Sequence, residues 1–284
     1  MHTARSVPVA PVWDPQQYLR HSGHRTRPFH DLLARIPEPP ATREGRPARI
    51  ADLGCGPGNV TALLADRWPE AHITGFDLSP EMLEQAEKEY SGTTARGGWL
   101  DFREADVAHW VPDEPYDLIV SNAALQWVPN HPESFPVWLD GLAPGGTLAF
   151  QVPANFTSPS HALLGELCET PRWRDRLGDR GRRFVHILDA AAYLDRLTDL
   201  GCAADVWETV YHQLLAGEDP VLDWVKGTAL RPVLTALDGD PEATAEFLAE
   251  YRDLLRRAYP PGPHGTAFPF RRLFAVARKT GSAG

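Results

Sequence analysis

Residues 49–58 read as a short apolar strand that runs directly into a glycine-rich turn. The strand 49–53 is followed by Gly54-Cys55-Gly56-Pro57-Gly58, and apolar residues at helical spacing begin after Asn59. Glycine lets a backbone turn tightly and approach a ligand closely. A strand, glycine turn and helix in this order is typical of folds in which parallel strands alternate with helices.

The same alternation continues along the chain and predicts seven strands. Their expected ranges are 49–53, 72–76, 100–104, 116–121, 147–152, 203–212 and 270–278. Because crossovers between parallel strands are almost always right-handed, the pattern predicts an α/β fold with a doubly wound, seven-stranded, mostly parallel sheet. Residues 218–259 have helical periodicity, and they predict an α-helical cap.

These patterns predict six consecutive ranges. They are an N-terminal tail with lid helices (1–46), a ligand-binding core (47–155), a cap or loop insertion (156–188), a core helix and strand (189–215), a helical cap (216–265), and the final core strand with a tail (266–284). Residues 37–47 are expected to be a linker because they are rich in proline, glutamate and arginine. The arginines between Arg172 and Arg183 are expected to lie in a solvated loop that could edge the pocket entrance.

Charge and cysteine content narrow the possible partners. The 284 residues carry a formal charge of −10, which disfavours a nucleic-acid partner held by phosphate contacts. The three cysteines lie far apart and form no metal-binding spacing, which favours a reducing, cytoplasmic location. No apolar run reaches the roughly 20 residues that span a bilayer. We therefore expect a monomer without membrane or nucleic-acid contacts that acts on a small molecule.

Acidic residues stand where the first three strands end. Asp52 precedes the glycine turn, Asp77 follows the second strand, and Asp106 follows the third. Ligands of such sheets bind outside the carboxyl ends of the strands. A nicotinamide site needs the spacing G-x-G-x-x-G, whereas this turn reads G-x-G-x-G, and Asp52 would repel a pyrophosphate. The residues instead favour a cationic ligand that carries a ribose. The Asp77 carboxylate can accept hydrogen bonds from the hydroxyls of that ribose.

Taken together, the turn 52–58, Asp77 and the strand 117–123 resemble the class I methyltransferases that use S-adenosylmethionine. Further segments resemble one family within that class, the trans-aconitate 2-methyltransferases. They are Trp13-Asp14-Pro15, Tyr18-Leu19, Arg25-Thr26-Arg27-Pro28, Ser121-Asn122-Ala123-Ala124-Leu125-Gln126-Trp127, residues 206–212, 223–225 and 227–232, and the C-terminal segment 268–278. The resemblance covers about residues 13–279, and extra residues near 40–46 and 91–98 depart from it.

The resemblance implies a Rossmann-like fold and a set of site residues. Those expected to bind S-adenosylmethionine are Asp52, Gly54, Cys55, Gly56, Gly58, Asp77, Leu78, Ser79, Met82, Asp106, Val107, Asn122 and Ala123. Those expected to bind the substrate are Tyr18, Arg25, Arg27, Gln126, Trp127, Tyr211, His212, Trp224 and Arg231. Residues 14–28 are expected to form part of a lid.

The implied reaction is the transfer of a methyl group to one carboxylate of trans-aconitate, a tricarboxylate, in a soluble bacterial enzyme. A carboxylate is already ionised at neutral pH, so we expect neither a catalytic base nor a metal. Arginines suit a multiply charged acid because their fork binds carboxylates in a bidentate way. The alternatives are another small carboxylic acid, a natural-product substrate, and a non-catalytic protein that only binds S-adenosylmethionine.

Overall fold

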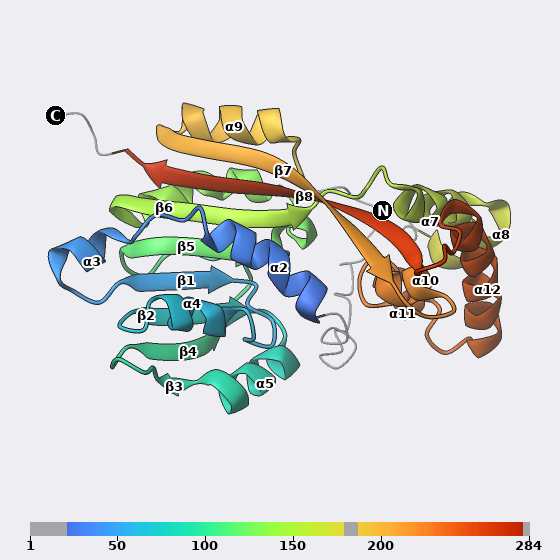
Figure 1. Cartoon of the computed structure of the whole chain (residues 1–284), viewed down its shortest axis with the longest axis horizontal. Coiled ribbons are helices and arrows are strands. Elements are labelled where there is room, and N and C mark those ends of the chain that lie inside the picture. The colour runs from blue at the N-terminus through green and yellow to red at the C-terminus, as the bar shows by residue number, and fades with distance from the viewer. Residues whose placement is uncertain (1–21, 179–186, 281–284) are drawn as a thin grey trace, which may run out of the picture. The chain divides into compact units, whose positions relative to one another are not determined.

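The structure is a computed structural model that describes residues 22–178 and 187–280 (Figure 1). Within them, eight strands form one sheet in the order β3-β4-β2-β1-β5-β6-β8-β7. The strands are β1 (Arg49–Leu53), β2 (His72–Asp77), β3 (Gly92–Thr93), β4 (Trp99–Glu104), β5 (Tyr116–Asn122), β6 (Leu142–Pro153), β7 (Cys202–Leu215) and β8 (Thr266–Lys279). The expected seven-stranded sheet thus gains β3, a two-residue strand antiparallel to β4.

The central strands are parallel, as the alternation predicts. β1 lies between β2 and β5, β2 also pairs with β4, and β5 pairs with β6. β8 runs antiparallel to β6, which makes the sheet mixed rather than purely parallel. Because all four central carboxyl ends meet at one edge, residues that follow β1, β2, β4 and β5 are brought side by side there.

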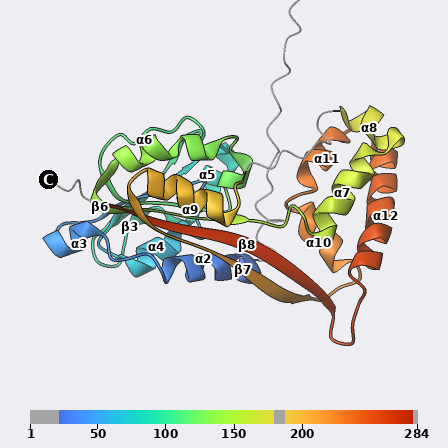
Figure 2. The ribbon, with the colours of Figure 1, turned by 90° about the horizontal axis from the view of Figure 1, so that it is seen from above.

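Helices cover both faces of this sheet (Figure 2). On one face, α6 (Phe135–Asp140) and α9 (Ala190–Asp199) bury Trp138 and Tyr193 against inward-facing strand residues such as Ala51 and Phe150. On the other face lie α2 (Ser22–Leu33) and α4 (Thr61–Arg67). Helix α5 (Pro80–Tyr90) packs along β2 and β4. Strands buried on both sides explain why β1 and β5 read as almost continuous apolar runs.

Pro144, Gly145 and Gly146 are residues typical of a turn, but they lie inside β6. The pairing register between β5 and β6 shifts between Tyr116 and Leu118 at this point, and Gly145 has a φ of +76°. An added Cβ at Gly146 would come within 3.1 Å of the Tyr116 carbonyl oxygen. Proline and glycine therefore mark an irregularity within a strand here, a role they also have in sheets.

The expected linker 37–47 contains a short helix, α3 (Pro40–Glu44). Asp117 at the start of β5 holds it: this buried carboxylate accepts hydrogen bonds from the Ala41 amide at 3.1 Å and from two nitrogens of Arg46 at 2.9 Å. It also accepts one from the Arg49 amide at 3.0 Å. Asp117 therefore joins the segment before β1 to the start of β5.

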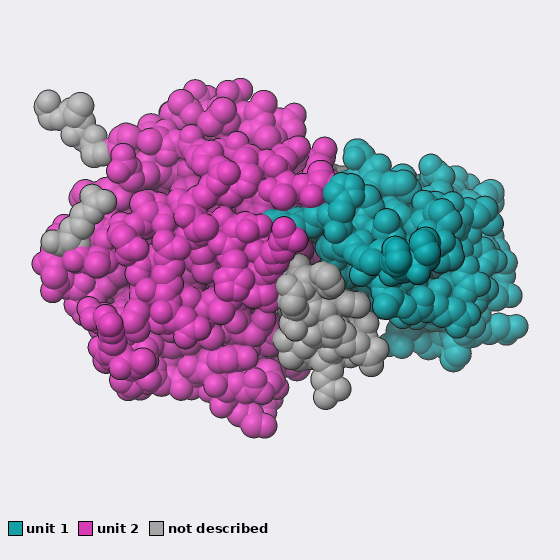
Figure 3. Space-filling model, in the orientation of Figure 1, with its two compact units in different colours: residues 1–21, 155–185, 211–270 teal, residues 22–154, 186–210, 271–284 magenta. Residues whose placement is uncertain are grey.

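The described residues divide into two compact units, which Figure 3 colours separately. Unit 1 comprises residues 155–178 and 211–270, and unit 2 comprises residues 22–154, 187–210 and 271–280. These boundaries differ from the expected ranges, because residues 22–46 belong to the sheet unit and both β7 and β8 continue from one unit into the other.

Unit 1 is built from five helices within its described residues. They are α7 (Pro159–Glu169), α8 (Pro171–Leu177), α10 (Pro220–Lys226), α11 (Arg231–Ala236) and α12 (Pro241–Ala258). The expectation of a loop from Arg172 onward is wrong as far as Leu177, because α8 buries Trp173 edge-on against Phe247 at 5.0 Å between ring centroids. Arg172 faces outward and pairs with Glu246 and Glu250 of α12. Residues 179–186 lie outside the described part of the chain.

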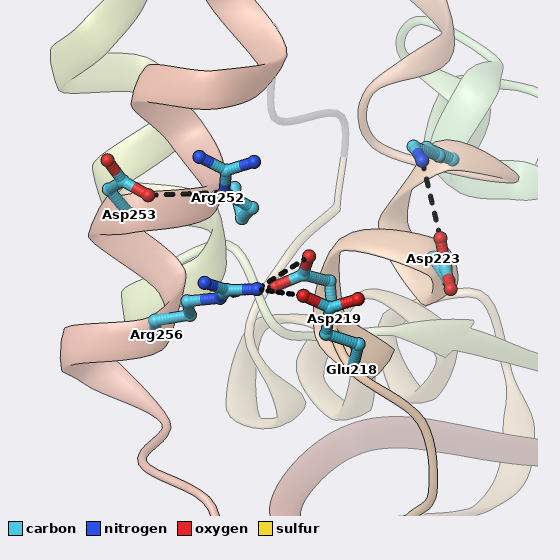
Figure 4. A network of polar contacts seen from close by, with 7 residues as sticks. Glu218, Asp219, Asp223, Arg252, Asp253 and Arg256 are labelled. Carbon is cyan, nitrogen blue, oxygen red and sulfur yellow. Dashed lines mark hydrogen bonds and ion pairs between the residues drawn. The ribbon is translucent and has the colours of Figure 1, made fainter.

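Charged side chains on the surface of unit 1 form local ion pairs (Figure 4). Arg256 of α12 donates to Asp219 at 2.6 Å and to Glu218 at 3.1 Å. Arg252 pairs with its neighbour Asp253. Exposed pairs of this kind stabilise a fold only weakly. Arg256 thus links the turn before α10 to α12, and it faces two carboxylates at once.

Candidate cofactor and substrate site

The glycine turn begins where β1 ends. The Gly54 and Cys55 amides both donate to the Phe76 carbonyl oxygen, at 2.7 and 3.0 Å, which ties the turn to β2. Gly54 has a φ of +75°, and an added Cβ there would lie 2.2 Å from the Ala124 Cβ. Gly56 also has a positive φ, of +56°, but an added Cβ would meet nothing within 4 Å. The turn is thus closed on the Gly54 side and open above Gly56.

Asp77 joins this turn to the start of α5. Its Oδ2 accepts a hydrogen bond from the Gly56 amide at 2.8 Å, and its Oδ1 accepts one from the Ser79 amide at 2.9 Å. Ser79 in turn caps α5, since its Oγ accepts from the Met82 amide at 3.3 Å. The half-buried carboxylate is therefore held in one orientation at the carboxyl end of β2.

Asp52 is a buried carboxylate with only one of its oxygens satisfied. The Thr61 hydroxyl donates to its Oδ2 at 2.7 Å, while its Oδ1 has no hydrogen-bond partner among the described residues. Burial raises the pKa of Asp52 to about 7, the Thr61 hydrogen bond opposes this rise, and the charge of Asp77 adds to it. An incompletely satisfied buried carboxylate favours a cationic group beside it.

The third acidic residue follows β4. Asp106 accepts a hydrogen bond from the Ala108 amide at 2.9 Å and contacts His109 Nδ1 at 2.9 Å. The Ala105 amide donates to the Asp77 carbonyl oxygen at 2.9 Å, so the segments after β2 and β4 are directly connected. Val107 is buried, whereas Leu78 is 52% exposed beside Asp77. The three acids thus lie at or just beyond the carboxyl ends of neighbouring strands, at one edge of the sheet.

The turn after β5 completes this edge. Ala123 has a left-handed φ of +55°, its amide donates to the Gln151 carbonyl oxygen at 2.9 Å, and its carbonyl oxygen accepts from Gln126 Nε2 at 2.5 Å. Gln126 was expected to donate to the substrate, yet its amide nitrogen supports this turn. Its Oε1 is buried without a partner among the described residues. Asn122, the last residue of β5, therefore leads into a braced turn at Ala123, and the next residue, Ala124, lies close to Gly54.

Cys55 lies in the glycine turn but is not suited to act as a nucleophile. It is 6% exposed, and burial, together with the charges of Asp52 and Asp77, raises the pKa of its thiol. Nucleophilic cysteines need a lowered pKa. Its side chain instead fills space near Gly75, where an added Cβ would lie 3.0 Å from the Cys55 Cβ.

The structure describes the side chains of some residues expected to bind the substrate and not of others. Trp127 is 39% exposed in the 3₁₀-helix η1 (Leu125–Trp127). Arg27 is exposed on α2. Arg25 also belongs to α2, but the structure does not describe its side chain. Tyr18 lies outside the described residues.

The other expected substrate residues belong to unit 1. Tyr211 and His212 follow each other on β7 and point to opposite faces, with Tyr211 buried and His212 exposed. Trp224 is 1% exposed and packs against Phe268 and Phe270 at 5.8 and 5.5 Å between ring centroids. Arg231 is half-buried at the first position of α11.

Three polar residues of this edge were not singled out from the sequence. Thr61 holds Asp52, Gln151 holds the turn after β5, and Arg272 donates to Gln151 Oε1 at 2.9 Å. Both Gln151 and Arg272 are buried, at 0% and 4% exposure. In the sequence, Gln151 and Arg272 are polar residues inside otherwise apolar strands. A polar residue in such a strand is equally consistent with a position at the sheet edge or on the surface.

Two features are absent from the described residues. Across 22–178 and 187–280, no three His, Cys, Asp or Glu side chains cluster in a way that could hold a metal ion. No helix in the same ranges combines the length and the apolar character needed to cross a membrane.

Comparison with known proteins places these features in context. A family model described as a methyltransferase domain matches residues 50–146. The trans-aconitate 2-methyltransferase of Streptomyces coelicolor is 63% identical over 97% of this chain and 89% of its own length. That of Streptomyces avermitilis is 65% identical over 96% of this chain and 99% of its own.

Solved structures show the fold. The phosphoethanolamine N-methyltransferase 2 of Haemonchus contortus, solved with S-adenosyl-L-methionine, superposes with a TM-score of 0.51 at 16% identity. The match covers 89% of this chain and 52% of that one. At this identity the likeness concerns the fold alone, and it agrees with the α/β sheet described above.

Proposed function

Since this chain belongs to the trans-aconitate 2-methyltransferase family, we propose that it transfers a methyl group from S-adenosylmethionine to one carboxylate of trans-aconitate. The products are the monomethyl ester and S-adenosylhomocysteine. The observation that carries the proposal is the edge formed by Asp52, Gly56 and Asp77, which combines an open glycine turn with a buried, half-satisfied carboxylate. Such an edge suits a ligand that carries both a ribose and positive charge.

The residues of this edge fit S-adenosylmethionine in chemical type. Asp77 would accept hydrogen bonds from the ribose hydroxyls, and Asp106 with the Val107 amide would bind the adenine. Asp52 would balance the positive charge of the ligand. The open space above Gly56 would let the ligand approach the backbone there. The remaining expected residues, which would contact it by packing or through the backbone, are Gly54, Cys55, Gly58, Leu78, Ser79, Met82, Asn122 and Ala123.

When bound, S-adenosylmethionine supplies an electrophilic methyl group that a carboxylate oxygen takes up as its methyl ester. The carboxylate is ionised at neutral pH, so the chain needs no general base to activate it. The protein's own contribution is to hold the acceptor oxygen in line and to exclude water. Alignment of this kind can lower a barrier by about 7–11 kcal/mol. That the reaction needs no metal, and that the chain acts as a monomer, stay predictions.

The acceptor acid requires positive or donating side chains. Arg25, Arg27 and Arg231 are the cationic candidates, because burying three carboxylates in a chain of net charge −10 requires paired donors. Trp127 would exclude water. Tyr18, Gln126, Tyr211, His212 and Trp224 are proposed on the resemblance alone, with the reservation that Gln126 already uses one amide hydrogen within its own turn.

The test is a panel of acids incubated with the purified chain and S-adenosylmethionine labelled in its methyl group. Trans-aconitate should be methylated with the highest kcat/KM, above cis-aconitate, isocitrate, citrate and a malonyl thioester. Mass spectrometry should find one added methyl group per acid. If another acid is methylated with higher kcat/KM, the substrate assignment is wrong. If none is methylated, the proposed activity is wrong.

A further inference from the structure

The two halves of the carboxyl edge of the sheet in unit 2 carry charges of opposite sign. Asp106 follows β4, Asp77 is the last residue of β2, and Asp52 lies near the end of β1; these three strands are neighbours in the sheet. On the next strands in the same order, β5, β6 and β8, the corresponding polar residues are Asn122, Gln151 and Arg272. One half of the edge is acidic, and the other half ends in a buried guanidinium. A carboxylate would be repelled by the first half and attracted by the second.

Asn122, Gln151 and Arg272 form one continuous chain of hydrogen bonds. Arg272 donates to Gln151 Oε1 at 2.9 Å, and Gln151 Nε2 donates to Asn122 Oδ1 at 2.5 Å. All three are buried: Arg272 is 4% exposed, Gln151 0% and Asn122 9%. Phe150, Val152 and Leu273, which alternate with Gln151 and Arg272, belong to the core under α6 and α9. The hydrogen-bonded chain therefore lies on the opposite face of the sheet, away from that core.

The chemistry of these groups fixes the direction of every bond. A guanidinium stays protonated and has only donors, so the oxygen of the Gln151 amide must face Arg272. The nitrogen of that amide then faces Asn122, whose oxygen must accept. Among the described residues, the hydrogen bond from Gln151 is the only one of the Asn122 side chain. The Asn122 amide nitrogen, with both hydrogens, is consequently presented as a donor beside Ala123.

From this arrangement we propose that Arg272, acting through Gln151, orients the Asn122 amide as a donor for a carboxylate at the end of β5. Arg272 and Gln151 are positioning residues in this scheme, and Asn122 is the residue that contacts the ligand. The inference rests on the proposed function, in which two carboxylates are at hand: that of the methionine part of the methyl donor and that of the acceptor acid. Positive charge at the end of the chain also polarises both amides and strengthens the final donor.

Three variants interrupt the chain at different points. Gln151→Glu keeps the bond to Arg272 but removes the donor to Asn122, so that the Asn122 amide is free to turn over. Arg272→Met removes the charge, and Arg272→Lys restores a charge and one donor. Asn122→Asp places a carboxylate where the donor stood. The matched control is Arg271→Met, which removes the same charge from the adjacent residue, where the guanidinium contacts the Ala154 carbonyl oxygen and Glu208 on the exposed side.

Two measurements separate the two carboxylates. Calorimetry gives the Kd for S-adenosylhomocysteine, and initial rates give kcat and KM for the acceptor acid. One of the two constants, Kd or KM, should rise about tenfold or more in Gln151→Glu, Arg272→Met and Asn122→Asp, as expected for the loss of a hydrogen bond to a charged group. Arg272→Lys should recover part of the loss, and Arg271→Met should stay within about twofold of wild type.

The outcomes are distinguishable. A rise in Kd assigns the donor to the methionine carboxylate, and a rise in KM with kcat preserved assigns it to the acceptor acid; either supports the proposal. If folded Gln151→Glu and Asn122→Asp leave both constants within twofold of wild type, the proposal is overturned. If the wild-type chain methylates no carboxylic acid, the proposed function fails, and the calorimetric arm still decides whether Asn122 is oriented for a carboxylate.

Discussion

Gly54 and Gly56 are two residues apart in the same turn and are constrained by different neighbours. Gly54→Ala would force a Cβ to within 2.2 Å of the Ala124 Cβ at a φ of +75°. We expect it to lower the free energy of unfolding by about 2 kcal/mol or more, from overpacking and an unfavourable φ. Thermal unfolding of the purified variant measures this loss.

Gly56→Ala provides the contrast, because its Cβ would meet no atom within 4 Å in the free protein. Only the cost of a positive φ remains, about 1 kcal/mol. Binding of S-adenosylhomocysteine should nevertheless weaken at least tenfold if the ligand occupies the open space above Gly56. Unchanged affinity in Gly56→Ala would show that the ligand lies elsewhere.

Asp52 makes ligand binding depend on pH. Its pKa of about 7 in the free protein should fall when the positively charged S-adenosylmethionine binds beside it, because an opposite charge favours the ionised form. Binding below pH 7 should therefore release up to about one proton, and affinity should increase as the pH rises through 7. Calorimetry in buffers of different ionisation enthalpy measures the release, and Asp52→Asn should abolish it.

The same shift has a consequence for stability with a definite sign. Because the pKa is raised in the folded state, the contribution of Asp52 is fully present below about pH 4 and is lost as the pH rises through 7. Asp52→Asn should therefore stabilise the free protein at about pH 8, and this gain should shrink towards about pH 4. A gain of equal size at both values would contradict the raised pKa.

The polar residues at or just beyond the carboxyl ends of strands were predicted better than those further inside. Asp52, Asp77 and Asp106 were predicted to share an edge, and the structure brings them to neighbouring strand ends, because parallel strands that alternate with helices have their carboxyl ends at one edge. Gln151 and Arg272 were missed. A polar residue within an apolar strand gains its meaning only from the strand beside it, and the antiparallel pairing of β6 with β8 joins residues more than a hundred positions apart.

At the scale of elements, α8 depends on one buried indole. Trp173 is 0% exposed, packs against Phe247, and donates through Nε1 to Glu250 at 3.1 Å. Trp173→Ala should therefore lower the free energy of unfolding of unit 1 by about 3–5 kcal/mol. Hydrogen exchange should show faster exchange in α8 and α12.

The neighbouring arginine serves as the control for this prediction. Arg172 is half exposed and pairs with two glutamates of α12. Arg172→Ala should change the stability by less than about 1 kcal/mol, since exposed ion pairs contribute little. If the two variants were equally destabilised, ion pairing rather than the buried indole would hold α8 in place.

Elements with strong local signals were predicted well, and elements that need a partner were not. Helices α5 and α9 carry their own start signals, since Ser79 caps α5 and Asp189 caps α9. In contrast, β3 is two residues long and exists only through its pairing with β4. The irregular start of β6 carries the proline and glycines of a turn, and only its pairing with β5 makes it part of a strand.

At the scale of the molecule, each unit has an apolar core of its own. One core of unit 2 lies between the sheet and helices α6 and α9, and a core of unit 1 lies among its helices. All the expected S-adenosylmethionine residues belong to unit 2, whereas the expected substrate residues are divided between the units. The residues expected to bind the methyl donor therefore all belong to the unit that holds most of the sheet, whereas those expected to bind the acceptor belong to both units.

The association of S-adenosylhomocysteine with the purified chain, followed by isothermal calorimetry, tests the central claim that the edge at Gly56 and Asp77 holds the methyl donor. The wild-type chain should bind one molecule per chain, and Asp77→Asn should bind it at least about tenfold more weakly. Glu84→Gln, the same change of charge at an exposed position of α5, should bind like wild type. Absence of binding by the wild-type chain, or equal affinity of wild type and Asp77→Asn, would contradict the account.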